Sequence, residues 1–169
     1  MDEETSLRRY GLRPAAADLD AIRALLGEHT ARERHTQGGG DTGLLRLCCV
    51  QLFNSGGPDD VLLVRSAKNA SCDAACAIEA ELLLGHGPGA TTAHLAAHPS
   101  PAAAAALERL RGLGAEGAFQ GFSVAGFSAD CDRYYQDEDA WARRVRGRAA
   151  PRRAGVGRAN GPRPAPCGA

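Results

Sequence analysis

The sequence predicts an all-α protein of five to seven short helices, arranged as antiparallel hairpins or as a short solenoid-like array. Three observations predict this fold class. Alanine supplies much of the 44% hydrophobic fraction and is the best helix former, whereas the β-branched residues that favour strands are sparse. Apolar residues recur at helical spacing in several segments. Short loops rich in glycine and proline separate these segments, as is typical of helices that return antiparallel to their neighbours.

The first predicted helix covers residues 15–35. Pro14 suits the first turn of a helix, and apolar residues such as Ile22 and Leu26 recur behind it at helical spacing. A run of three glycines ends this helix. Residues 1–13 precede it and are expected to form a polar lead-in.

The segment from Leu44 to Phe53 is apolar on nearly every side, which predicts a helix in the middle of the core. Asp41 or Thr42 can cap its start, and glycine and proline stop it after residue 54. The next apolar run, residues 61–64, has the composition of a buried strand. The acids before it and the basic residues after it favour a helix instead, because they complement a helix dipole.

Later elements are less regular. Helices are predicted over residues 72–84 and 90–97, and another starts at Ser100-Pro101, where a capping residue precedes a proline. Residues 115–130 place phenylalanines among glycines and serines, which suggests a packed loop. A last helix is expected over about 137–147.

The charge is divided unevenly along the 169 residues, a length that fits one ordinary domain. Residues 142–169 contain eight arginines and no acid, whereas the rest of the chain has 12 basic and 20 acidic residues. A segment of arginine, proline, glycine and alanine cannot form a core. We therefore expect a helical domain over 14–141 and a disordered basic tail over 142–169.

The sequence predicts a soluble, cytoplasmic protein. Its first residues are acidic and lack an apolar run, so no secretory signal is indicated. No stretch of about 18 apolar residues exists, so no contact with a membrane is expected. In a reducing compartment the six cysteines are expected to be free thiols.

The most specific constellation of potential ligands consists of two pairs. Cys72 and Cys76 lie four residues apart on one predicted helix, and His94 and His98 lie four apart on the next. Residues at this spacing share a helix face, and two sulfur and two imidazole ligands suit tetrahedral zinc. Zinc is the one cofactor that the sequence suggests. The spacing departs from that of a zinc finger, and small buried cysteines beside a helix end would explain the pattern without metal.

The basic tail is a candidate surface for nucleic acids or other polyanions, which it would bind through phosphate contacts. It lacks interleaved aromatic residues, so base stacking is not indicated. Alternatives are docking onto the acidic body or a solvated extension without a partner. The candidate nucleic-acid-binding residues are Arg143, Arg144, Arg146, Arg148, Arg152 and Arg153.

Other reactive residue types have structural explanations. Cys48 and Cys49 lie within the apolar helix, where burial opposes the low thiol pKa that reactivity needs. Cys131 lies between Asp130 and Asp132, and neighbouring acids also raise a thiol pKa. The acidic residues at 130–139 can hold a hard cation, but a solvated acidic face explains them equally.

No catalytic signature rises above background, which favours a protein that is not an enzyme, but catalytic residues gathered from distant loops would leave no local motif. The predicted function is a helical module that binds another protein through a groove between hairpins. A faint repeat of 30 residues supports this hypothesis, because Leu52-Phe53 and Gly57-Pro58 match Leu82-Leu83 and Gly87-Pro88. A zinc-site protein and a tail that associates with nucleic acid are the two alternatives.

Overall fold

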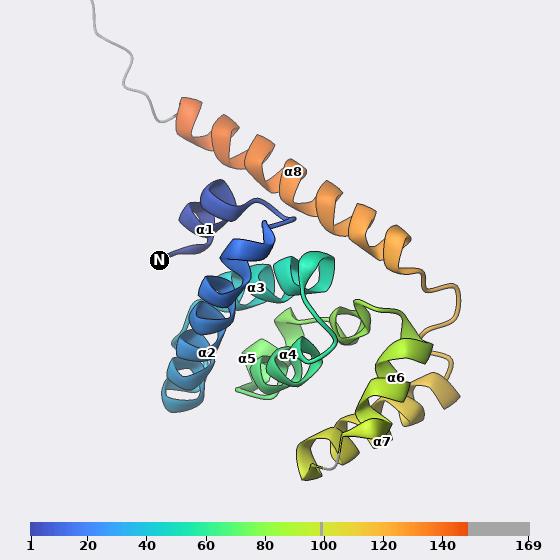
Figure 1. Ribbon diagram of the computed structural model, residues 1–169. Helices are drawn as coiled ribbons and strands as arrows, with labels where there is room; N and C mark the ends of the chain where they lie inside the picture. The colour runs from blue at the N-terminus through green and yellow to red at the C-terminus, as the bar shows by residue number, and fades with distance from the viewer. Residues whose placement is uncertain (99, 149–169) are drawn as a thin grey trace, which may run out of the picture. The chain divides into compact units, whose positions relative to one another are not determined.

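The computed structural model describes residues 1–98 and 100–148, with side chains described as far as residue 137. Within that part of the chain all regular structure is helical, with eight α-helices and two short 3-10 helices (Figure 1). The predicted fold class is confirmed, with one α-helix more than the expected maximum. The elements are α1 (Glu3–Tyr10), η1 (Ala16–Asp18), α2 (Leu19–Thr36), α3 (Thr42–Ser55), α4 (Asp60–Lys68), α5 (Cys72–Ala77), η2 (Ala80–Leu84), α6 (Pro88–Ala97), α7 (Pro101–Ala115) and α8 (Val124–Arg148).

The chain divides into two compact units, Met1–Tyr135 and Gln136–Ala169. The first unit contains α1 to α7 and the start of α8, and it holds the whole described core. The described part of the second unit is the remainder of α8. The groove between α4 and α7 and the cluster of Asp59, His94 and His98 both lie entirely in the first unit.

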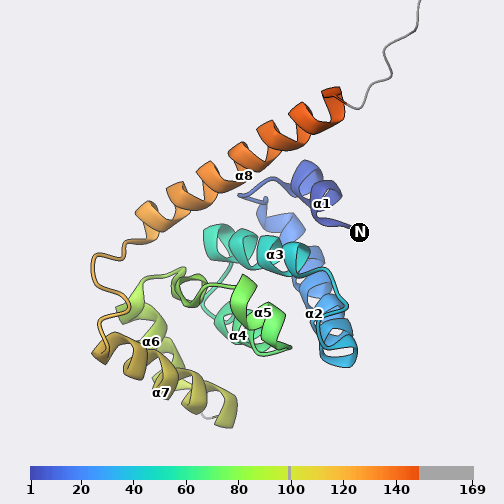
Figure 2. The same cartoon turned by 180° about the vertical axis from the view of Figure 1, so that it is seen from behind.

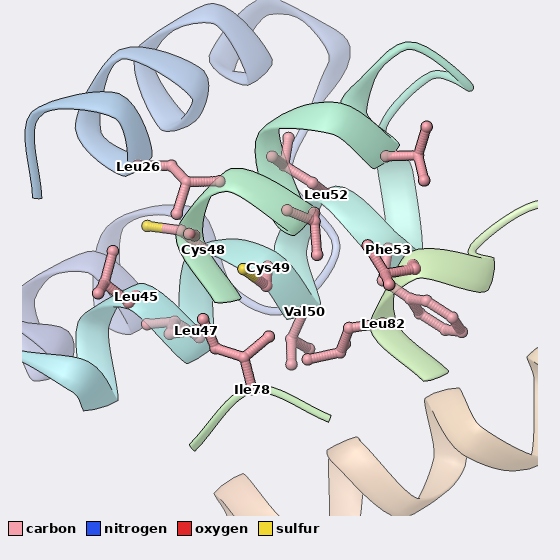
Figure 3. Packing of buried hydrophobic residues seen from close by; sticks show 14 of the residues in the cluster. Leu26, Leu45, Leu47, Cys48, Cys49, Val50, Leu52, Phe53, Ile78 and Leu82 are labelled. Carbon is pink, nitrogen blue, oxygen red and sulfur yellow. The ribbon is translucent and has the colours of Figure 1, made fainter. Parts of the chain in front are cut away.

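Helix α3 is the centre of the core, as its apolar sequence predicts. It contacts α1, α2, α4, α5 and η2. Leu45, Leu47, Cys48 and Cys49 are completely buried, and Figure 3 shows Leu26 of α2 near Cys48 and Ile78 near Leu47. Because every face of α3 meets a neighbour, the amphipathic helices around it can each bury one side.

Residues 1–13, expected as a polar lead-in, contain the helix α1, which packs against α3. Its apolar pattern is weak, but its ends are well formed. The Asp2 side chain accepts a hydrogen bond from the Thr5 backbone N–H, at 2.8 Å, and so caps the start. Gly11, with a φ of 63°, ends the helix through its N–H to the Leu7 carbonyl.

The predicted helix over 72–84 is divided into α5 and η2 at Ile78, which is extended and completely buried. Tertiary contacts explain the break. The Lys68 ammonium donates hydrogen bonds to the carbonyls of Ala75 and Ile78, at 2.6 and 2.5 Å, and thereby caps the end of α5. The Arg46 guanidinium pairs with Glu79 at 2.7 Å and holds the next residue against α3.

Helices α6 and α7 lie side by side as a hairpin (Figures 1 and 2). The prediction for the following segment was partly wrong: after turns over residues 116–121, α8 begins at Val124 and continues through the helix expected at 137–147. A packed loop therefore covers only the first part of 115–130. Residues 142–148 of the expected tail lie in α8, and residues 149–169 lie outside the described residues.

One glycine allows two elements to meet at backbone distance. A Cβ atom on Gly85, directly after η2, would lie 2.8 Å from the carbonyl oxygen of Phe53 and 3.2 Å from its Cα. Real side chains do not tolerate such a contact with backbone atoms. Gly85 therefore permits the end of η2 to reach the last turns of α3.

None of the helices in the described residues combines the length and the apolar character needed to cross a membrane.

Candidate functional site

A groove with a volume of about 330 Å³ lies between α4 and α7. We call it the α4–α7 groove. Of its two alanines, Ala106 is the last of the five that follow Pro101 at the start of α7, and Ala80 comes from η2. A methyl group fills less space than the side chains that usually pack between helices, so the helices leave a hollow. The groove is lined by Arg65, Lys68, Asn69, Ala80, Leu83, Ala106, Arg109 and Leu113.

The base of the α4–α7 groove is apolar. Leu83 and Ala106 are buried in the core and keep only 6% and 2% of their surface exposed. Leu113 is half-buried near the end of α7. An apolar base with polar edges is the usual construction of a site that receives a side chain of another molecule.

The edges of the α4–α7 groove are basic. Arg65 and Lys68 come from α4 and Arg109 from α7, and among the described residues no acidic side chain lines the groove. Lys68 is engaged by the carbonyls of Ala75 and Ile78. Arg65 makes only a 3.5 Å contact to the Ala102 carbonyl. Arg109 makes no hydrogen bond or ion pair with the described part of the chain, so its charge is available to a ligand.

A second constellation brings both predicted histidines together with an acid. The Oδ1 atom of Asp59 lies 3.2 Å from Nε2 of His94 and 3.4 Å from Nε2 of His98. The two imidazole rings lie 4.2 Å apart between centroids. We call these three residues the Asp59 cluster. It links the residue before α4 to the last turn and C-cap of α6.

The two cysteines of the predicted zinc site are not part of this cluster. Cys72 and Cys76 are exposed on α5, and neither lies within 4.8 Å of both histidine ligand atoms in the described structure. Of the four predicted ligands, the fold brings His94 and His98 together and does not bring the cysteines to them. Zinc binding itself stays a prediction.

The remaining described cysteines are core residues, as the sequence indicates. Cys48 and Cys49 are completely buried and Cys131 keeps 2% of its surface exposed. Burial raises the pKa of the Cys48 thiol to about 12, and it raises the pKa of Cys49 strongly. The pKa of Cys131 is raised to about 11, mainly by burial, with smaller contributions from Asp130 and Asp132. The flanking acids were therefore the lesser cause.

We expect alkylation to separate these two groups of cysteines. Iodoacetamide at pH 8 should label Cys72 and Cys76 within minutes and leave Cys48 and Cys131 unmodified, because their thiols are buried and protonated. Peptide mass spectrometry of the quenched reaction measures this. Labelling in denaturant, where all thiols are accessible, is the control. Fast modification of Cys48 in the native protein would contradict the burial of α3.

The acidic residues near Cys131 pair with arginines. Arg13 binds Asp132 through both carboxylate oxygens, each at 2.8 Å, and these hydrogen bonds lower the pKa of Asp132. Asp130 pairs with Arg133. These pairs favour the interpretation of a solvated, charged helix face over that of a cation site.

The arginines proposed to bind nucleic acid are only partly within the described structure. The backbone of Arg143, Arg144, Arg146 and Arg148 belongs to α8, whereas Arg152 and Arg153 lie outside the described residues. Binding of nucleic acid through this segment stays a prediction.

The roles of Asp59 and Arg109 could not be predicted from the sequence. Asp59 was interpreted only as an acid that favours the start of a helix, because the histidines lie 35 residues further along the chain. Arg109 belongs to a helix whose solvent-facing charges look ordinary in sequence. The role of each residue depends on a contact between segments that are distant in the sequence, and no local pattern indicates such a contact.

Comparisons with protein-family models, with curated proteins and with solved structures find no significant match to this chain.

Proposed function

We propose that this protein is a helical interaction module whose α4–α7 groove binds an acidic, partly apolar segment of a partner protein. The observation that carries the proposal is the combination of an apolar base with arginines from two helices and no lining acid in the described structure. We further propose that it acts in the cytoplasm, where its five described cysteines would remain free thiols.

The basic lining of the α4–α7 groove favours a partner segment that carries acidic side chains. Residues 1–141 carry 12 basic and 20 acidic side chains, so three cations without an acid among them are a local exception. At physiological salt the screening length is about 8 Å, so a ligand in the groove responds mainly to the nearest charges. Arg65 and Arg109 can then pair with carboxylates.

The apolar base distinguishes a peptide from other anions. A leucine-sized side chain can pack against the half-buried Leu113 while acidic neighbours reach the arginines, in the way that helical peptides use an apolar anchor with charged flanks. A sugar–phosphate backbone has no group that gains from contact with these apolar atoms. We therefore favour an acidic peptide over a nucleic acid for this groove.

The test uses a fluorescent 14-residue helical peptide of glutamate, alanine and leucine, with a lysine-for-glutamate version as the charge control. Fluorescence anisotropy with the full chain should show binding of the acidic peptide that weakens as salt increases. Arg109→Glu should weaken this binding roughly ten-fold or more, because it replaces an attraction with a repulsion.

Arg111→Glu is the matched control. Arg111 lies on the same helix, is exposed and does not line the groove, so the same change of charge should leave the affinity within about two-fold. Equal losses for the two variants would show a nonspecific charge effect and overturn the proposal. Absence of binding to the acidic peptide, or tighter binding of a single-stranded oligonucleotide to the same groove, would overturn it as well.

A further inference from the structure

We propose that Asp59, His94 and His98 form a binding site for one divalent transition-metal ion of the zinc class. This inference goes beyond the proposed function and does not depend on it. Two imidazoles and one carboxylate are a ligand set that zinc accepts in proteins, with the remaining position open to water. The side chain of Asp59 is 81% exposed, which leaves that position accessible to solvent.

The distances from the Asp59 oxygen to the two imidazole nitrogens fit a metal ion. Zinc binds imidazole nitrogen and carboxylate oxygen at about 2.0–2.2 Å, so two ligand atoms of a tetrahedral site lie about 3.4 Å apart. The Asp59 oxygen lies 3.2 Å from Nε2 of His94 and 3.4 Å from Nε2 of His98. The three ligand atoms lie within 4.8 Å of one another, close enough for one ion to bind all three after small side-chain movements.

Helix geometry places the two imidazoles. His94 and His98 are separated by four residues, one turn of α6 and its C-cap, so their side chains project from the same face. Asp59 reaches them from the start of α4. An ion here would join α4 to the α6–α7 hairpin.

A hydrogen bond at Nδ1 of His98 indicates that its other ring nitrogen, Nε2, is the one that can bind an ion beside Asp59. Its Nδ1 atom lies 3.1 Å from the His94 carbonyl oxygen, which can only accept, so Nδ1 carries the hydrogen. In the neutral imidazole Nε2 then presents a lone pair to the Asp59 carboxylate. Two lone pairs at 3.4 Å repel each other unless a proton or a metal ion lies between them. A backbone carbonyl on Nδ1 is also the usual support of a metal-binding histidine.

His94 supplies a second, independent observation. Its Nε2 atom is buried and has no hydrogen-bond partner of acceptable geometry in the described structure, although the Asp59 oxygen is near. A buried polar atom without a partner is costly. A metal ion bound to this nitrogen would satisfy it.

The test is calorimetric titration of ZnCl2 into the full chain after removal of metals with a chelator. We expect one ion per chain at the cluster and an increase in thermal stability with zinc. Asp59→Asn keeps the shape of an exposed side chain, and His98→Gln removes one imidazole. Each should weaken binding about ten-fold or more, because loss of one of three protein ligands removes much of the site.

Two further variants make the result specific. His35→Gln changes an exposed histidine of α2 outside the cluster and should bind zinc like the parent chain. The double variant Cys72→Ser/Cys76→Ser should also keep its zinc, and Co²⁺ bound to the parent chain should lack a sulfur-to-metal charge-transfer band. Binding that is lost in the cysteine variant, retained in Asp59→Asn, or absent from the parent chain would overturn the proposal.

Discussion

Leu47→Ala is expected to lower the free energy of unfolding by about 2–5 kcal/mol, the range for a large core residue replaced by alanine. Leu47 lies in α3 and is completely buried. The variant loses the transfer free energy of the removed atoms and leaves a cavity, because helices contact α3 on every side and cannot all move inward. Urea denaturation followed by circular dichroism measures the change, provided that the slope with urea stays constant.

Leu63→Ala is the comparison for this experiment. Leu63 lies on α4 and is only partly buried, so the same chemical change should cost about 1 kcal/mol. If the two variants lost the same stability, α3 would not be the centre of the core.

Asp60→Ala is expected to lower the free energy of unfolding by about 2–4 kcal/mol. The side chain of Asp60 is 6% exposed and accepts hydrogen bonds from Nε and Nη2 of Arg23, at 2.7 and 2.9 Å. It also accepts a 2.8 Å hydrogen bond from the N–H of Gly57. The variant therefore removes the link between α2 and α4 together with the support of the turn before α4.

Asp20→Ala tests whether this cost comes from burial. Asp20 pairs with the same Arg23 at 2.8 Å, but its side chain is 95% exposed. Its loss should change stability by less than about 0.5 kcal/mol. Thermal or urea denaturation of the two variants in parallel measures the difference. A cost for Asp20→Ala as large as that for Asp60→Ala would mean that burial does not govern the pair.

The sequence predicted those elements whose own residues decide their structure. Helix α3 was predicted because a segment that is apolar on nearly every side is stable only inside a core. The start of α7 was predicted correctly from Ser100-Pro101. Helix α1 has few apolar residues, so its apolar pattern does not predict it, but its capping signals do. Asp2 before the helix, the acids in its first turn and Gly11 after it are all sequence signals of helix ends.

Features that depend on contacts between distant segments could not be predicted in this way. The break at Ile78 depends on Lys68 and Arg46, which reach the segment from α4 and α3. The grouping of Asp59 with His94 and His98 depends on how α4 meets α6. The α4–α7 groove forms because small side chains lie between the two helices. Which residues face each other there cannot be recognised from any single position of the sequence.

The backbone contact at Gly85 limits how this sequence can diverge. Any replacement there must push Phe53 aside, and a Cβ on Gly56 would likewise lie 2.5 Å from the Leu52 carbonyl oxygen. Gly57 and Gly112 have no such neighbour within 4 Å. Homologous chains that keep the fold should therefore vary at positions 57 and 112. At positions 85 and 56, both close to the end of α3, they should keep glycine.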